Sequence, residues 1–146
     1  MDKTFNNSLL GQYHEDIFKY LNEFIYRYNR YEIEFSALLI YSSNQRLDLE
    51  PIEKNIRTSD KIFKLNDNIF LTVFDVVDYL GGLKASQKIE YTYKESYPHC
   101  KIFYAYATIH EKESPYDIVT RLFMALDYAV NESLPNLVVD HVMIRE

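Results

Sequence analysis

The feature that most constrains this chain is an almost uninterrupted apolar run over residues 35–41, which the polar residues Ser42, Ser43 and Asn44 end. A strand with one solvated face alternates apolar and polar residues, whereas a strand buried on both faces is apolar throughout. The run therefore predicts a central strand covered on both faces of its sheet. The covering elements must come from a chain of 146 residues, a length typical of one compact domain.

Amphipathic helices are predicted on both sides of this strand. Apolar residues recur at three- and four-residue steps over residues 8–28, which is the spacing of one helical face. A short helix is predicted within residues 48–59. A longer one is predicted over residues 76–91, with Gly81 and Gly82 weakening its middle. The last helix follows Ser114 and Pro115, of which the serine is expected to cap its first turn.

Four further strands complete the predicted sheet. Residues 61–65 and 69–74 are rich in β-forming side chains, and the polar residues between them tolerate the left-handed backbone of a tight hairpin. Residues 101–110 and 137–144 supply the other two strands. The order of elements predicts an α+β fold, an α/β sandwich with a central five-stranded sheet and flanking helices. An N-terminal amphipathic helix (residues 1–30) is expected to pack on, or extend, a domain of residues 31–146.

Composition excludes several functions. The net charge of −6 and the pI near 5.2 argue against binding of duplex nucleic acid. The single Cys100 forms no disulfide within the chain, and we find neither a signal peptide nor an apolar run long enough to span a bilayer. The four histidines lack metal-ligand spacing. We therefore expect a cytoplasmic protein without membrane insertion, metal or cofactor.

Two stretches carry a resemblance to a known family. Arg57-Thr58-Ser59-Asp60 is followed by five residues and then by the hairpin residues 66–70. The second stretch, residues 118–129, is a late helix that leads through Leu134-Pro135-Asn136 into the last strand. In order and spacing these stretches resemble the GGDEF family of diguanylate cyclases, whose fold is related to that of nucleotide cyclases. The resemblance covers roughly residues 35–139 and implies a bacterial signalling domain.

The same resemblance implies that catalysis is lost. Family members bind GTP and two metal ions through an Asp-x-Asp pair after the first strand and an acidic hairpin, but this chain has neutral side chains at those positions. Its glycine positions carry larger residues, one of them acidic, which would repel a triphosphate. The degenerate active-site positions are Tyr41, Ser43, Asn66, Asp67, Asn68, Ile69 and Phe70. We therefore expect no diguanylate cyclase activity, because magnesium needs anionic oxygen ligands.

A regulatory ligand site is the function that the resemblance leaves open. In the family, Arg-x-x-Asp before the hairpin binds cyclic di-GMP, and Arg57 and Asp60 match it by spacing. Lys88, in the following helix, would add positive charge on the same side. The alternative interpretation is that Arg57 and Asp60 form an exposed ion pair that ends a helix.

Two functions therefore compete. The first is a catalytically inactive GGDEF-like receptor or adaptor that binds cyclic di-GMP. The second is a protein-interaction module that has lost nucleotide binding and holds a partner or a second copy through its N-terminal helix or the old active-site face. An enzyme with altered chemistry is a third interpretation, which no recognisable nucleophile, base or metal cluster supports. Tyrosines beside polar stretches are typical either of such an interface or of the edge of a core: Tyr26, Tyr28, Tyr31, Tyr41, Tyr91, Tyr93 and Tyr97.

Overall fold

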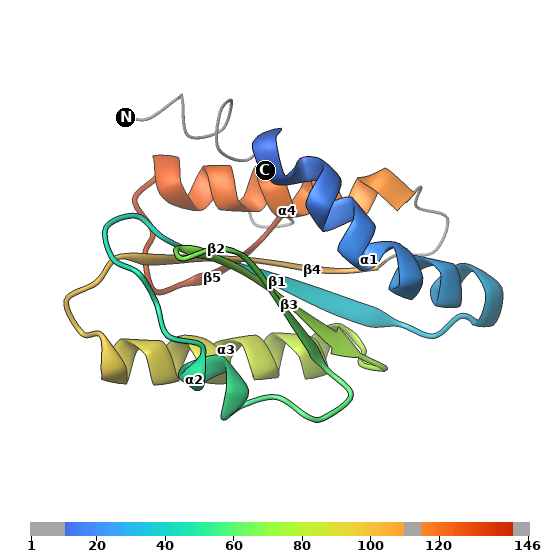
Figure 1. Ribbon diagram of the computed structural model, residues 1–146, viewed down its shortest axis with the longest axis horizontal. Coiled ribbons are helices and arrows are strands. Elements are labelled where there is room, and N and C mark those ends of the chain that lie inside the picture. The colour runs from blue at the N-terminus through green and yellow to red at the C-terminus, as the bar shows by residue number, and fades with distance from the viewer. Residues whose placement is uncertain (1–10, 110–114, 142–146) are drawn as a thin grey trace.

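A computed structural model describes residues 11–109 and 115–141, and Figure 1 shows a sheet between two layers of helices. The elements, in chain order, are α1 (Gly11–Tyr31), β1 (Phe35–Ser42), α2 (Glu50–Glu53), β2 (Lys61–Asn66), β3 (Ile69–Asp75), α3 (Tyr79–Ser96), β4 (Ile102–Thr108), α4 (Pro115–Asn131) and β5 (Val138–Asp140). The predicted α+β sandwich with five strands is confirmed.

The strand predicted to be central lies in the middle of the sheet. The strand order is β2-β3-β1-β4-β5, so β1 has a neighbour on each side. It pairs antiparallel with both β3 and β4, β2 pairs antiparallel with β3, and β5 lies parallel to β4. The end of β1 pairs with the start of β3, where Tyr41 is opposite Ile69. The β2–β3 turn therefore lies beside the end of β1.

The two faces of the sheet carry side chains of different size. On β4, Ala105 and Ala107 contribute to the core under α1 and α4, while Tyr104 and Tyr106 contribute to the core under α3. Small residues let α4 approach β4 closely, and the larger tyrosines fill the space below α3. Every residue of β1 except the half-buried Tyr41 is buried, so the coverage of both faces predicted for this strand is confirmed. All of β4 is buried as well.

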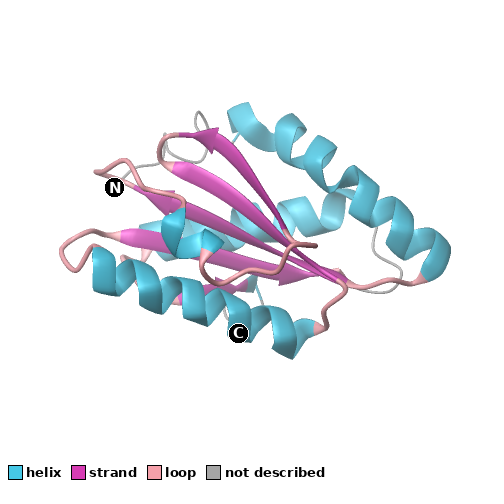
Figure 2. Cartoon of the chain, turned by 60° about the horizontal axis from the view of Figure 1, so that its bottom comes forward, coloured by secondary structure: helices cyan, strands magenta, loops and turns pink. Residues whose placement is uncertain are grey.

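Helices α1 and α4 cover one face, and α2 and α3 cover the other (Figure 2). The apolar face of α1 is buried against the sheet, as its three- and four-residue spacing predicts. The buried residues of this helix are Ile17, Leu21, Phe24 and Ile25. None of the described helices has the length and apolar character needed to cross a membrane.

The structure corrects three local expectations. The helix within residues 48–59 is shorter than predicted, since α2 has only four residues. The hairpin turn needs no left-handed residue, because none of residues 66–68 has a positive φ and a bulge between Lys64 and Asn66 adjusts the strand instead. The glycines of α3 lie in its first turn rather than its middle. The expected cap at Ser114 and the end of the last strand beyond residue 141 lie outside the described residues.

Close packing explains one of the two glycines. A Cβ at Gly82 would lie 2.7 Å from Ser36 Oγ and also against the Tyr106 hydroxyl. Those two hydroxyls are hydrogen-bonded to each other at 3.0 Å beneath the helix. The absence of a side chain at Gly82 therefore lets the start of α3 rest directly on β1 and β4.

Candidate functional site

The loop between α2 and β2 is organised around the carboxylate of Asp60. This carboxylate accepts hydrogen bonds from the backbone N–H of Arg57 at 2.8 Å and from the backbone N–H of Asp75 at 2.9 Å. The guanidinium of Arg57 also donates to it, from Nη2 to Oδ1 at 3.0 Å. Asp60 thereby fixes the loop against the end of β3, and its oxygens are all engaged within the chain.

Arg57 and Asp60 differ sharply in exposure. The Asp60 side chain is 3% exposed, whereas that of Arg57 is 53% exposed. The Arg57 guanidinium also donates from Nη2 to the backbone carbonyl of Asp75, while Nη1 donates to no described residue. The alternative of an exposed pair that ends a helix is wrong in two respects: α2 ends at Glu53, and the aspartate is buried. Of the two residues, the guanidinium is the one within reach of a ligand.

Arg57, Asp60 and Lys88 line the same cavity, which has a volume of about 320 Å³. Helix α3 contributes two lysines to it, Lys84 and Lys88, four residues apart and hence on one helical face. Neither ammonium group forms an ion pair with a described carboxylate. With Arg57 they give the cavity three cationic side chains, and Asp60, the only acid among the described residues that line it, is already satisfied. The i, i+4 spacing of Lys84 and Lys88 was the sequence signal that could have identified Lys84.

The positions predicted to be a degenerate active site gather at another corner of the sheet, where β1 ends beside the β2–β3 turn. The side-chain amide of Asn68 donates to the backbone carbonyls of Ser42 and Gln45, both at 3.0 Å. The backbone carbonyl of Asn68 accepts from the N–H of Ser42 at 3.0 Å, and that of Asp67 accepts from the N–H of Leu47 at 3.1 Å. The segment after β1 is therefore hydrogen-bonded to the turn, with no helix in between.

Basic side chains surround the acid of this turn. Asp67 Oδ1 lies 2.9 Å from Lys64 Nζ and 3.5 Å from Arg46 Nη2. The hydrogen bond from Lys64, and then the positive charge of Arg46, lower the pKa of the Asp67 carboxyl below its ordinary value. Asn66 is held as well, since its side chain donates to the Tyr13 hydroxyl at 2.9 Å.

The remaining positions of this corner offer little to a metal ion. Ile69 and Phe70 are buried in the core, Tyr41 is half-buried and Ser43 is exposed. Within residues 11–109 and 115–141, no three or more His, Cys, Asp or Glu side chains form a group that could hold a metal ion. Neutral amides and hydroxyls are weak ligands for a hard cation.

The corner and the Arg57 loop lie at opposite ends of β2, whose six residues span about 20 Å.

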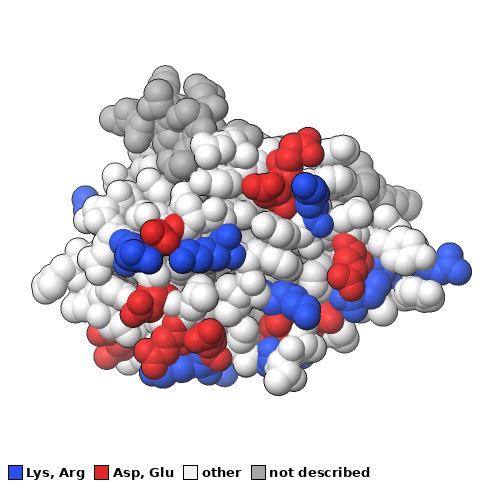
Figure 3. All heavy atoms as spheres, viewed as in Figure 1, with Lys and Arg blue, Asp and Glu red and all other residues white. Residues whose placement is uncertain are grey.

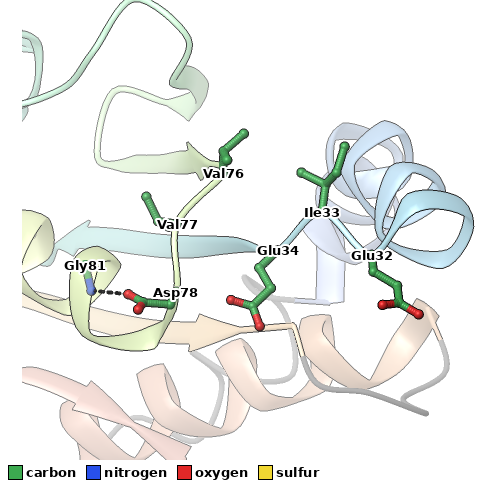
Figure 4. A pocket seen from close by; sticks show the side chains of 7 residues that line it. All are labelled: Glu32, Ile33, Glu34, Val76, Val77, Asp78 and Gly81. Carbon is green, nitrogen blue, oxygen red and sulfur yellow. Dashed lines mark hydrogen bonds between the residues drawn. The ribbon is translucent and has the colours of Figure 1, made fainter.

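An acidic hollow of about 670 Å³ opens beside the Arg57 cavity and has the opposite charge (Figure 4). Its lining includes Glu32 and Glu34 before β1 and Asp78 at the start of α3. Asp78 caps that helix by accepting from the N–H of Gly81 at 2.8 Å. The two hollows share Val77 and Gly81. An anionic ligand is repelled from this acidic side, which none of the predicted site residues lines.

Comparison with solved structures relates this architecture to known proteins. The GGDEF domain of DgcB from Caulobacter crescentus, solved in complex with c-di-GMP, is 11% identical with a TM-score of 0.69, over 88% of this chain and 90% of that one. The active GGEEF domain of a diguanylate cyclase from Vibrio cholerae is 16% identical with a TM-score of 0.63, over 79% and 87%. Both likenesses concern the fold.

A third similar structure contains a protein partner. It is the diguanylate cyclase SiaD from Pseudomonas aeruginosa in complex with its activator SiaC, at 12% identity and a TM-score of 0.66, over 86% of this chain and 57% of that one. No protein-family model matches this sequence, and no curated protein does. Structural likeness alone therefore relates this chain to the GGDEF fold.

Proposed function

Starting from this GGDEF-like fold, we propose that the chain binds a cyclic dinucleotide, cyclic di-GMP, through Arg57, Lys84 and Lys88, and does not synthesise it. The observation that carries the proposal is the cavity in which these three cationic side chains meet without a free carboxylate. Guanidinium and ammonium groups bind phosphate oxygens by charge-assisted hydrogen bonds. The c-di-GMP bound to the DgcB domain makes this ligand the first to test.

Asp60 has a positioning role in this proposal. Its carboxylate holds the backbone of the loop and the Nε and Nη2 groups of the Arg57 guanidinium, which leaves the Nη1 group for a phosphate oxygen. An aspartate that is bound in this way cannot also accept hydrogen bonds from a guanine edge. The site would therefore recognise the phosphates of the ligand with the arginine and the lysines.

The absence of synthesis is supported by the closed corner at the β2–β3 turn. The amide of Asn68 holds the segment after β1 against the turn, and the charge on Asp67 is paired with Lys64 and Arg46. A nucleotide triphosphate with two metal ions needs several anionic ligands, which this corner does not offer. Incubation with GTP and Mg²⁺ or Mn²⁺ should therefore yield no cyclic di-GMP.

Isothermal titration calorimetry tests the binding. The wild-type protein should bind cyclic di-GMP with a free energy of about −8 kcal/mol, a micromolar affinity. Lys88→Met should weaken binding roughly tenfold, because one charge-assisted contact is lost. Lys94→Met is the matched control, since Lys94 is exposed on the same helix outside the cavity lining. Absence of binding by the wild-type protein up to millimolar ligand would overturn the proposal.

The second candidate function is a protein-interaction module. Two large aromatic side chains on α1, Tyr26 and Tyr31, are 57% and 60% exposed, which is typical of interface tyrosines. The complex of SiaD with SiaC is an instance of a protein partner bound by a chain of similar fold. A wild-type protein that binds no cyclic di-GMP would favour this second function.

A further inference from the structure

A second cavity adjoins the proposed phosphate site along α3. It has a volume of about 400 Å³ and is lined by Asn55, Lys84, Gln87, Lys88, Tyr91 and Thr92. Three of these residues, Asn55, Lys84 and Lys88, also line the Arg57 cavity, so the two cavities adjoin each other along α3. None of the described residues that line the second cavity is acidic. A ligand held by the lysines would therefore extend naturally into it.

Tyr91 gives the second cavity an exposed aromatic ring. Its side chain is 62% exposed and follows Lys84 and Lys88 at the i, i+4, i+7 spacing of one helical face. Its neighbour Tyr93 shows the contrasting role, being fully buried with its hydroxyl donating to the Asp48 carbonyl at 2.6 Å. The ring of Tyr91 stacks on no other described aromatic side chain. It is therefore available to a ligand.

Asn55, which lines the second cavity, connects α2 to α3. Its side-chain amide donates to the Thr92 hydroxyl of α3 at 2.9 Å and to the Pro51 carbonyl of α2 at 2.8 Å. These bonds tie the end of α2 to α3 beside Tyr91. The cavity is thus framed by two elements that are bonded to each other, as a preorganised binding site requires.

An exposed aromatic ring next to two unpaired ammonium groups suits a nucleotide. A nucleobase stacks on an aromatic side chain while its phosphates contact cations, and every base offers a flat face for such stacking. We propose that the second cavity is a base-stacking subsite, in which the ring of Tyr91 packs against a purine of the nucleotide whose phosphates contact Lys84 and Lys88. The identity of that nucleotide as cyclic di-GMP rests on the proposed function.

A fluorescence experiment tests the stacking directly. The chain contains no tryptophan, so in Tyr91→Trp all indole emission comes from the subsite. Titration with cyclic di-GMP should quench this emission, because a guanine would lie against the indole. Tyr26→Trp is the matched control: Tyr26 is similarly exposed but belongs to α1, on the opposite face of the sheet, and its emission should not change. Unchanged emission from Tyr91→Trp while the ligand binds would overturn the subsite.

Affinities measured on three ligands separate the subsite from the proposed function. Tyr91→Ser should bind cyclic di-GMP about tenfold more weakly than the wild type, and Tyr91→Phe should bind within about twofold, because it retains the ring. Neither substitution should alter the affinity for inorganic pyrophosphate, which has no base. Equal binding of cyclic di-GMP by wild type and Tyr91→Ser would overturn the subsite alone.

GMP distinguishes the remaining outcomes. Binding of GMP that depends on Tyr91, without any binding of cyclic di-GMP, would overturn the proposed function and leave the base-stacking subsite standing. Absence of binding by either nucleotide would overturn both proposals.

Discussion

Asp60 shows how much one buried carboxylate does in this chain. It accepts hydrogen bonds from two backbone N–H groups and from the Arg57 guanidinium, in a position with 3% exposure. The spacing of Arg57 and Asp60 indicated that the two belong together. It could not indicate that the aspartate also bonds to Asp75, because that contact depends on the path of the chain through β2 and β3.

The substitution Asp60→Asn should destabilise the protein by about 1–3 kcal/mol, because an amide NH₂ group would then face N–H donors in a buried position. Urea denaturation measures the change. Asp67→Asn is the control: Asp67 is half exposed and its ion pairs lie at the surface, so its substitution should change the stability much less than Asp60→Asn does. Equal losses from the two substitutions would contradict the structural role of Asp60.

At the scale of elements, α3 shows where a sequence pattern misleads. The pair Gly81-Gly82 predicted a weak middle of a helix, because glycine has a low helix propensity. In the structure the helix begins at Tyr79, after the Asp78 cap, so the glycines lie in its first turn. Val76 precedes this start with a φ of 53°, an unusual value for a β-branched residue. The spacing of apolar residues identified the helix. It could not reveal the contact of Gly82 with β1 and β4, because that contact joins segments that are far apart in the sequence.

The two glycines should therefore respond differently to alanine. Gly82→Ala should lower the free energy of unfolding by about 1–3 kcal/mol, because the new Cβ overlaps the Ser36 and Tyr106 hydroxyls. Gly81→Ala should change it by less than about 1 kcal/mol, because the new Cβ would meet the Asp78 side chain at 3.1 Å and Val77 Cβ at 3.7 Å, while alanine has the higher helix propensity. Thermal denaturation compares the two variants. A Gly82→Ala variant as stable as Gly81→Ala would contradict the close packing of α3.

At the scale of the whole molecule, the largest fully buried side chains of the described residues include three tyrosines, Tyr93, Tyr104 and Tyr106. Burial raises the pKa of Tyr104 and of Tyr93 far above the ordinary value, and it raises that of Tyr79 to about 12. The folded state thus holds these phenolic protons more tightly than the unfolded state, whose tyrosines ionise near pH ~10. Their contribution to stability is complete below that pH and is lost as the pH rises through the folded-state values.

The protein should therefore unfold in alkali, with tyrosinate absorbance and loss of the far-ultraviolet circular dichroism rising together above about pH 10. Tyr104→Phe isolates one group, because the Tyr104 hydroxyl is buried without a hydrogen-bond partner among the described residues. This variant should match the wild type at neutral pH and lose stability less steeply in alkali, by up to ~1.4 kcal/mol per pH unit. If the stability of the two proteins fell equally steeply with pH, the contribution of the Tyr104 hydroxyl would be contradicted.

The overall order of elements was predictable because the apolar run of β1 and the helical periodicity of α1 and α4 can be recognised in the sequence. Basic and acidic side chains lie side by side on the face shown in Figure 3, as expected for a chain with many charges of both signs and a net charge of −6. The position of the two cavities side by side could not be predicted. It arises where a loop from one part of the chain meets the exposed face of α3, and neither shows an unusual pattern by itself.

The amide of Asn68 also limits which side chains position 68 can carry. Its NH₂ group donates to the carbonyls of Ser42 and Gln45 and so closes the segment after β1 over the hairpin turn. A carboxylate at position 68 would face those same two carbonyl oxygens and repel them. An acidic side chain at position 68 and the closed segment therefore exclude each other, and a single substitution that placed an acid there would open the segment after β1.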